Sequence, residues 1–263
     1  MTLSLKKDLI SFCERMIFFM KNNENILNKL KMVCYKIVKD CAMINKKEEV
    51  IILCDFTSDQ HLINTLYETI SKIGANVSII KRISPDRPHD LPPKVVDWAM
   101  RGSDVIIDIS KYDILHTLPI RRALLDCGSR LINMSGHNSN TLIKPNIADI
   151  DYKKLHKKAV KLVEILENGN EFIYKNPRGT YLKADITNRK WYPLDGIARK
   201  PGSFAVFPVG EVLGSAVPGT PNGIVFLDYL ATFGRLKSPI KLYIKNGWVE
   251  KIEGGEEAEK LKN

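Results

Sequence analysis

The sequence predicts an α/β protein, in which a doubly wound, mostly parallel sheet is followed by a smaller β-rich domain. Between residues 50 and 134, short apolar runs alternate with segments of helical periodicity, as expected for parallel strands joined by crossover helices. After residue 170 the pattern changes to short extended runs separated by glycine and proline, which is typical of antiparallel sheets. We therefore expect an α/β domain at residues 1–170, including an N-terminal helical extension, and a β-rich domain at 171–263.

The first domain contains four predicted strands. Val50 to Cys54 is a continuous apolar run that ends at Asp55, and Leu62 to Ile73 then repeats apolar residues at helical spacing before Gly74. Such buried strands with helices on both faces give a Rossmann-like layout. The later strands are expected at Val77–Ile80, Val105–Ile109 and Arg130–Met134, and the later helices at Val95–Met100, Pro119–Cys127 and Asp151–Glu167.

The second domain is predicted from its hairpins. Phe172–Tyr174 and Thr180–Ile186 flank a proline-glycine turn. Ile240–Ile244 and Trp248–Ile252 alternate strictly around Asn246-Gly247, which is a strong hairpin signal. The edge of this closing hairpin offers unpaired backbone groups, so we expect a homodimer or a protein partner there.

Composition indicates a globular protein, with 44% hydrophobic and 27% charged residues. The net charge is +10, but the lysines of 153–161 sit at helical spacing around apolar residues, as on a solvated helix face, so we expect no nucleic-acid partner. The five cysteines are odd in number and include no CxxC pair, which favours reduced thiols and a cytoplasmic location.

The N-terminal apolar run from Leu9 to Met20 is interrupted by Glu14 and Arg15. It lacks a cleavage site for a signal peptide and is too short to span a bilayer. We expect a packed or interfacial amphipathic helix and no membrane anchor.

Candidate contact residues lie at the carboxyl ends of the predicted strands, where α/β sheets bind ligands. Asp55 follows the first strand, and His116 with Thr117 follows the third, ahead of Arg121. Asp55 is a candidate cleft or substrate contact. His116 and Thr117, ahead of Arg121 and Arg122, are candidates for contacting an anion at a helix start, and the alternative of local capping and surface ion pairs remains open. No GxGxxG or P-loop follows any strand, so no nucleotide cofactor is predicted.

The segment Phe207 to Asp228 carries the candidate metal ligand, Glu211, directly after Gly210. Its prolines and glycines keep the backbone out of helix and allow the close approaches that binding loops need. We include Gly210 among the candidate cleft residues for that reason. All five histidines precede the segment, so a metal site around Glu211 lacks nearby nitrogen ligands.

Several motifs carry a family resemblance. They are LHTLPIRRALLDCGSRLINMSG, NPRGTYLKADI, DGIARKPGSFAVFPVGEV, NGIVFLD and KLYIKNGWVEKIEGGEEAEKL. Together they resemble the aminopeptidase T and S group of metallo-aminopeptidases, whose relatives include ring-opening dihydroxypyridine dioxygenases. The resemblance runs from about Lys46 to the last residue.

The resemblance implies a two-metal site in the peptidases and a single non-haem iron in the dioxygenases. Glu211 takes the glutamate position of the P-x-G-E box, and the β-rich domain resembles the start of the metal-site domain. The remaining peptidase ligands belong to a region beyond the end of this chain, so the resemblance implies a truncated protein or a short relative that has lost the site.

The expected function is a metal-dependent aminopeptidase-like hydrolase with an incomplete metal site. Its cofactor would be divalent Zn, Co, Mn or Fe, with no metal at all if the chain is inactive. One alternative is a non-catalytic peptide-binding or adaptor module. Another is a non-haem iron ring-cleaving dioxygenase relative. The expected ligand is accordingly a peptide or a small-molecule substrate.

Overall fold

The computed structural model describes residues 24–230 and 232–262, and the chain forms two compact units. The first unit comprises Met1–His156 with Leu194–Gly210, and the second comprises Lys157–Pro193 with Glu211–Asn263. Each unit is therefore built from two separate stretches of sequence. The N-terminal apolar run at Leu9 to Met20 lies outside the described residues. Within the described residues, no helix is long and apolar enough to cross a membrane.

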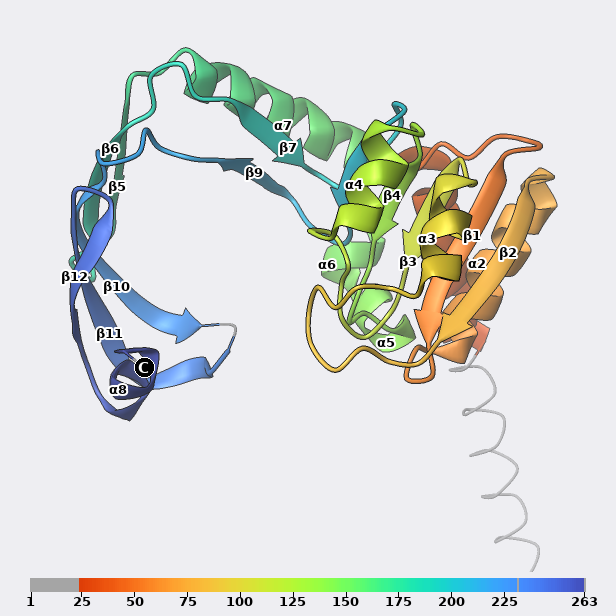
Figure 1. Cartoon of the computed structure of the whole chain (residues 1–263), viewed down its shortest axis with the longest axis horizontal. Coiled ribbons are helices and arrows are strands. Elements are labelled where there is room, and N and C mark those ends of the chain that lie inside the picture. The colour runs from red at the N-terminus through yellow and green to blue at the C-terminus, as the bar shows by residue number, and fades with distance from the viewer. Residues whose placement is uncertain (1–23, 231, 263) are drawn as a thin grey trace, which may run out of the picture. The chain divides into compact units, whose positions relative to one another are not determined.

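A five-stranded sheet forms the centre of the first unit, in the order β2-β1-β3-β4-β8 (Figure 1). All neighbouring strands run parallel. The chain places β2 on one side of β1 and β3 on the other, which makes the sheet doubly wound. The strands are β1 (Glu49–Asp55), β2 (Asn76–Arg82), β3 (Val105–Asp108), β4 (Arg130–Asn133) and β8 (Phe204–Val206).

Helices cover both faces of this sheet (Figure 1). On one face α2 (Gln60–Ile73) packs its buried leucines and isoleucines against alternate residues of β1 and β3. On the other face α3 (Lys94–Arg101) and α4 (Leu118–Leu125) bury theirs against the intervening residues. Burial on both faces explains why these strands read as continuous apolar runs. Other helical segments are a helix at residues 24–36, η1 (Ile37–Cys41), α5 (Ser139–Leu142), α6 (Pro145–Ala148) and α7 (Tyr152–Glu167).

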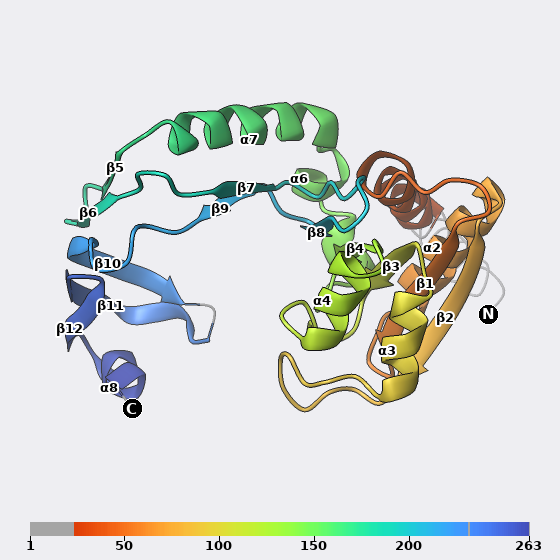
Figure 2. The same cartoon turned by 45° about the horizontal axis from the view of Figure 1, so that its top comes forward.

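A five-stranded antiparallel sheet forms most of the second unit, in the order β12-β11-β10-β6-β5 (Figure 2). A short helix, α8 (Glu256–Lys262), packs Ala258 against Leu236 and Ile240 of the sheet. A separate two-stranded ladder pairs β7 with β9. The strands are β5 (Glu171–Lys175), β6 (Tyr181–Asp185), β7 (Trp191–Leu194), β9 (Glu211–Gly214), β10 (Asn222–Leu230), β11 (Gly234–Lys245) and β12 (Trp248–Glu253).

The predicted fold class is confirmed, because a parallel α/β sheet is followed by antiparallel β-rich structure. The closing hairpin is also confirmed: Asn246 and Gly247 both have positive φ, 51° and 80°, and join β11 to β12. Strands β7, β8, β9 and β10 were not predicted from the sequence. Of these, β8 follows a proline-glycine stretch and contains only three residues.

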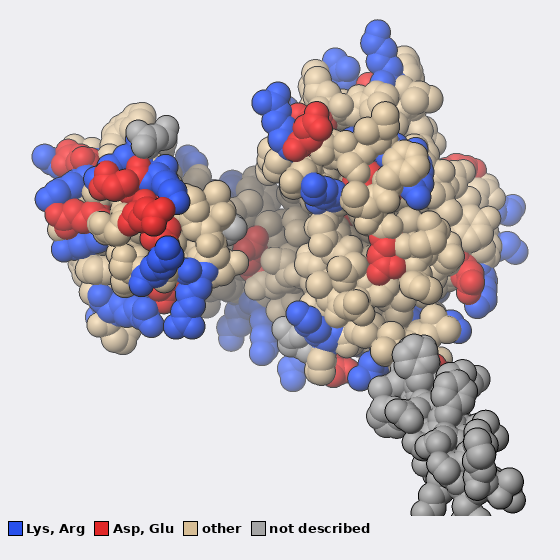
Figure 3. All heavy atoms as spheres, turned by 90° about the horizontal axis from the view of Figure 1, so that it is seen from below, with Lys and Arg blue, Asp and Glu red and all other residues tan. Residues whose placement is uncertain are grey.

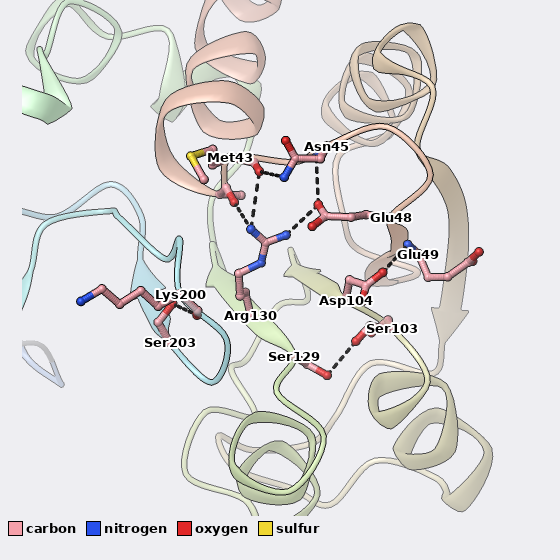
Figure 4. Close-up of polar contacts among 11 residues, drawn as sticks. Met43, Asn45, Glu48, Glu49, Ser103, Asp104, Ser129, Arg130, Lys200 and Ser203 are labelled. Atoms are coloured by element: carbon pink, nitrogen blue, oxygen red, sulfur yellow. Dashed lines mark hydrogen bonds and ion pairs between the residues drawn. The ribbon is translucent and has the colours of Figure 1, made fainter.

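At the amino edge of the parallel sheet, Arg130 ties several loops together (Figure 4). Its side chain is buried, donates a hydrogen bond of 2.8 Å to the carbonyl oxygen of Ala42, and lies 2.7 Å from the carboxylate of Glu48. The arginine thus joins the start of β4 to the segment that connects η1 with β1.

Candidate functional site

Three neighbouring strands of the parallel sheet end in the same hydrogen-bonded turn. In each, a side-chain oxygen of the last strand residue accepts the backbone N–H two residues later, where a serine or threonine stands. The three turns run from Asp55 to Thr57 at 2.8 Å, from Asp108 to Ser110 at 3.0 Å and from Asn133 to Ser135 at 3.0 Å. The carboxyl edge is therefore polar, and much of its hydrogen-bonding capacity is used to hold its own loops.

Asp55 lies at this edge, as the sequence predicts, and is buried. Its Oδ2 accepts the backbone N–H of Lys111 at 2.6 Å, and its Oδ1 accepts both the N–H and the hydroxyl of Thr57. Burial raises the pKa of Asp55, but the hydrogen bonds from Lys111 and Thr57 outweigh it and lower the pKa overall. The carboxylate thus joins the loop after β1 to the loop after β3.

The pKa of Asp108, on the neighbouring strand β3, is shifted in the direction opposite to that of Asp55. Its carboxylate is almost fully buried and accepts a hydrogen bond from the Ser135 hydroxyl at 3.1 Å. Burial raises the pKa of this carboxyl, and hydrogen bonds from Ser110 and Ser135 only partly oppose the effect. Two adjacent strands therefore carry carboxyl groups whose pKa values shift in opposite directions.

His116 is exposed in the loop after β3. It lies against a second histidine, which is not among the predicted contact residues. Its ring meets the ring of His89 edge to face, with 5.1 Å between centroids. Nδ1 of His89 lies 3.1 Å from the carboxylate of Asp113. The two histidines come from the loops before α3 and before α4, 27 positions apart in sequence, so sequence spacing offers no signal for the pair.

Thr117 and Arg121 flank the start of α4. Thr117 is the N-cap residue, yet its hydroxyl donates to the carbonyl oxygen of Ile114 at 2.7 Å instead of capping the helix. Arg121 is exposed on the first turns of the helix. The structure therefore places His116, Thr117 and Arg121 on one loop and helix start, as the sequence predicts.

His156 and Asp195 form a second polar pair in the first unit. Nδ1 of His156 lies 2.7 Å from Oδ2 of Asp195, whose side chain is 1% exposed. The other oxygen of Asp195 accepts the N–H of Ile197 at 3.2 Å. The buried aspartate thus orients the imidazole and fixes its own turn. The pair joins α7 to the segment before β8.

Gly210 and Glu211 fall in different units. A Cβ on Gly210 would lie 3.1 Å from the side chain of Leu155, so the glycine permits a close approach there. Glu211 is the exposed first residue of β9. The other candidate contact residues, Asp55, His116, Thr117 and Arg121, belong to the first unit with Gly210.

No group of three or more His, Cys, Asp or Glu side chains that could hold a metal occurs in residues 24–230 and 232–262. Cys34 and Cys41 are buried, and burial raises the pKa of each thiol to about 12. The donor set of the described residues therefore does not fit a catalytic metal, which takes about three protein ligands.

Charged residues of both signs intermingle on the face of the molecule seen in Figure 3. In the second unit, for example, Lys183 pairs with Glu171 at 2.6 Å and Lys251 with Glu253 at 2.5 Å. The positive net charge is thus partly compensated locally.

Comparison with protein families identifies the family of this chain. The profile described as NicX, 2,5-dihydroxypyridine 5,6-dioxygenase, matches residues 29–263. The chain belongs to the NicX family. No curated protein sequence matches it significantly. The motifs led us to expect an aminopeptidase-like protein, with the dihydroxypyridine dioxygenases as relatives of that group. The matching family of this NicX-family member is that of the dioxygenases.

Solved structures give the same fold for this NicX-family chain. The 2,5-dihydroxypyridine dioxygenase from Pseudomonas putida KT2440 is similar with a TM-score of 0.76 and 18% identity, over 89% of this chain and 70% of the other. Wild-type AmpT from Thermus thermophilus is similar with a TM-score of 0.64 and 14% identity, over 89% of this chain and 73% of the other. At these identities the likeness establishes the fold.

Proposed function

We propose that this NicX-family protein takes part in oxidative opening of a small hydroxylated aromatic ring, and not in peptide hydrolysis. The observation that carries the proposal is the family match over residues 29–263. The fold is shared with both a dioxygenase and AmpT, so it does not by itself separate the two activities.

The metal is the critical requirement of this proposal. Iron is the expected metal for a dioxygenase, and Glu211 is the one ligand that the sequence motif supplies. Because the described residues do not form a ligand group around it, we derive no chemical step through a metal. An active enzyme needs further ligands from another polypeptide chain or from residues outside the described ones.

Two assays on the same preparation distinguish the activities. Oxygen uptake with 2,5-dihydroxypyridine is followed after anaerobic loading with ferrous iron, and release of p-nitroaniline from aminoacyl anilides is followed after loading with zinc or cobalt. We expect oxygen uptake, and we expect Glu211→Gln to abolish it together with bound iron. Glu250→Gln is the matched control, because Glu250 is also an exposed strand glutamate.

Anilide hydrolysis without oxygen uptake would overturn the proposal in favour of an aminopeptidase. A second candidate is a non-catalytic binding module, which is favoured by the lack of a three-ligand group among the described residues. That function predicts no metal by elemental mass spectrometry and no turnover in either assay, with measurable binding of a peptide or of an aromatic ligand by calorimetry.

A further inference from the structure

Arg82 is a buried cation with unused hydrogen-bond donors. It is the last residue of β2, and the residue is 8% exposed. Nε and Nη2 are both buried and have no hydrogen-bond partner in the part of the chain that the structure describes. The carboxylate of Asp108 is near enough to interact electrostatically with Arg82, but it accepts no hydrogen bond from Nε or Nη2. Leaving a buried donor without an acceptor costs about 1–3 kcal/mol, so an acceptor for these two donors is required.

The position of Arg82 within the sheet shows what surrounds it. The strand register pairs Arg82 with Asp55 and pairs Asp108 with Leu53. Because parallel partners share a face, and residues two apart on a strand share one too, Arg82, Asp55 and Asp108 point to the same side of the sheet. The two aspartates are held by their own turns, whereas the arginine ends a strand without such a turn.

Other unpaired polar atoms lie at the same carboxyl edge. The buried Ser110 hydroxyl sits beside Asp108 without a well-oriented hydrogen bond, and Nδ1 of His137, in the turn after β4, is buried without a partner. Such groups are rare in folded proteins and require an explanation. Their location coincides with the edge where doubly wound sheets bind ligands.

The charged neighbours of Arg82 leave its unpaired N–H groups free. Lys81 precedes Arg82 and therefore points to the opposite face of the sheet, with Cys54, whereas Lys111 follows β3 and donates its backbone N–H to Asp55. Their ammonium groups lie 5.0 Å from the Phe56 ring centroid and 4.8 Å from the Tyr112 ring centroid. Asp55 accepts hydrogen bonds from its own loops. Burial raises the pKa of Asp108, and Ser110, Ser135 and the charge of Arg82 partly oppose this shift. Both aspartates thus use their oxygens on neighbouring loops, and Nε and Nη2 of Arg82 stay available to an acceptor from outside the described residues.

We propose that this carboxyl edge of the sheet binds a small oxyanion, a carboxylate or a phosphate, through Nε and Nη2 of Arg82. These two atoms form one edge of the planar guanidinium and present two parallel N–H bonds to two oxygens of the anion. Since the donors are buried, the occupant is small and sheds its water on binding. The proposal is independent of the ring-opening function.

Binding to the folded state raises the melting temperature with ligand concentration, which provides the test. Wild-type protein is titrated with sodium formate, acetate and inorganic phosphate in calorimetry and in thermal unfolding, at an ionic strength held constant with sodium chloride. We expect saturable binding of either carboxylates or phosphate, and comparing the formate and acetate titrations with the phosphate titration shows which of the two binds. Arg82→Met should weaken binding at least tenfold, and Arg87→Met, which removes an exposed arginine from the following loop, should leave it unchanged.

Arg82→Lys covers the case in which the methionine variant does not fold. Lysine keeps the charge but lacks the two-pronged edge, so we expect a folded protein with binding weakened at least tenfold. Chloride that stabilises the wild type as well as the oxyanions would overturn the proposal. So would equal oxyanion binding by the wild type and either Arg82 variant, which would assign Arg82 a purely structural role.

Discussion

Nη2 of Arg130 lies 2.7 Å from Oε2 of Glu48, and Nη1 of the same guanidinium donates to the Ala42 carbonyl oxygen at 2.8 Å. The arginine side chain is 6% exposed. One residue at the start of β4 thus holds the polypeptide that leads into β1, and we regard this contact as a structural anchor of the first unit.

Replacing Arg130 with methionine removes both contacts and leaves Glu48 and the carbonyl oxygen without their donor. We expect a loss of about 3 kcal/mol in the free energy of unfolding, which is typical when one partner of a buried pair is removed. Urea denaturation followed by circular dichroism measures it. Arg87→Met serves as the control, because Arg87 is exposed; equal losses in the two variants would contradict the anchoring role.

The Asp55 carboxylate should contribute stability that depends on pH. Its pKa is lowered from an ordinary value of 3.8, so the contribution is present above that value and disappears as the pH falls through the lowered pKa. Asp55→Asn should therefore cost about 2 kcal/mol near pH 7, and the cost should shrink as the pH falls from 3.8 through the lowered pKa. Urea midpoints across this range test it, and a cost that does not vary with pH would contradict it.

The His156–Asp195 pair should fix the tautomer of the imidazole. Because Oδ2 of Asp195 lies 2.7 Å from Nδ1, the neutral ring should carry its proton on Nδ1. Nitrogen-15 chemical shifts of the histidine ring report this tautomer directly. In Asp195→Asn we expect a shift toward the Nε2-protonated form, with His61 as the exposed reference.

Glycine is required at position 214 by packing. A Cβ there would lie 2.2 Å from the Trp191 ring, whereas a Cβ on Gly219 would meet nothing within 4 Å. Gly214→Ala should cost about 2 kcal/mol or more through overpacking. Gly219→Ala, at φ +81°, should cost about 1 kcal/mol from backbone strain alone. Thermal unfolding of both variants is the measurement, and equal costs would show that the ring moves aside freely.

Glu211→Gln should leave the metal-free protein as stable as wild type, with melting temperatures within about 2 °C of each other. The residue is exposed at the start of β9, so a carboxylate that serves only a metal has no folding role. A large loss in metal-free buffer would identify it as a structural residue.

The parallel strands could be predicted because burial on both faces leaves a continuous apolar run, as in Ile51 to Cys54. The closing hairpin could be predicted because Asn246-Gly247 suits positive φ. β8 could not, since three residues with one fully buried member carry no periodic signal. Its partner, β4, lies more than 70 residues earlier in the chain.

The positions of the candidate residues in the fold could be predicted in part, whereas their roles stay predictions. A polar residue directly after a buried strand located Asp55 at the carboxyl edge, because strand direction alone determines that edge. The contact between His116 and His89 and the unpaired donors of Arg82 depend on how two loops fold over the sheet. Neither loop conformation follows from local sequence. The three repeated turns correspond to the tripeptides Asp-Phe-Thr, Asp-Ile-Ser and Asn-Met-Ser. The sequence alone does not show that these tripeptides end neighbouring strands of one sheet.

The pairing of β4 with β8 has a consequence for biosynthesis. Phe204–Val206 completes the parallel sheet, but the ribosome must first make residues 157–193, which belong to the other unit. Until then the nascent sheet ends at β4, whose four residues are buried in the finished protein. An exposed edge of this kind promotes strand pairing between chains, so a pause in translation within residues 134–203 should favour aggregation and recruitment of chaperones.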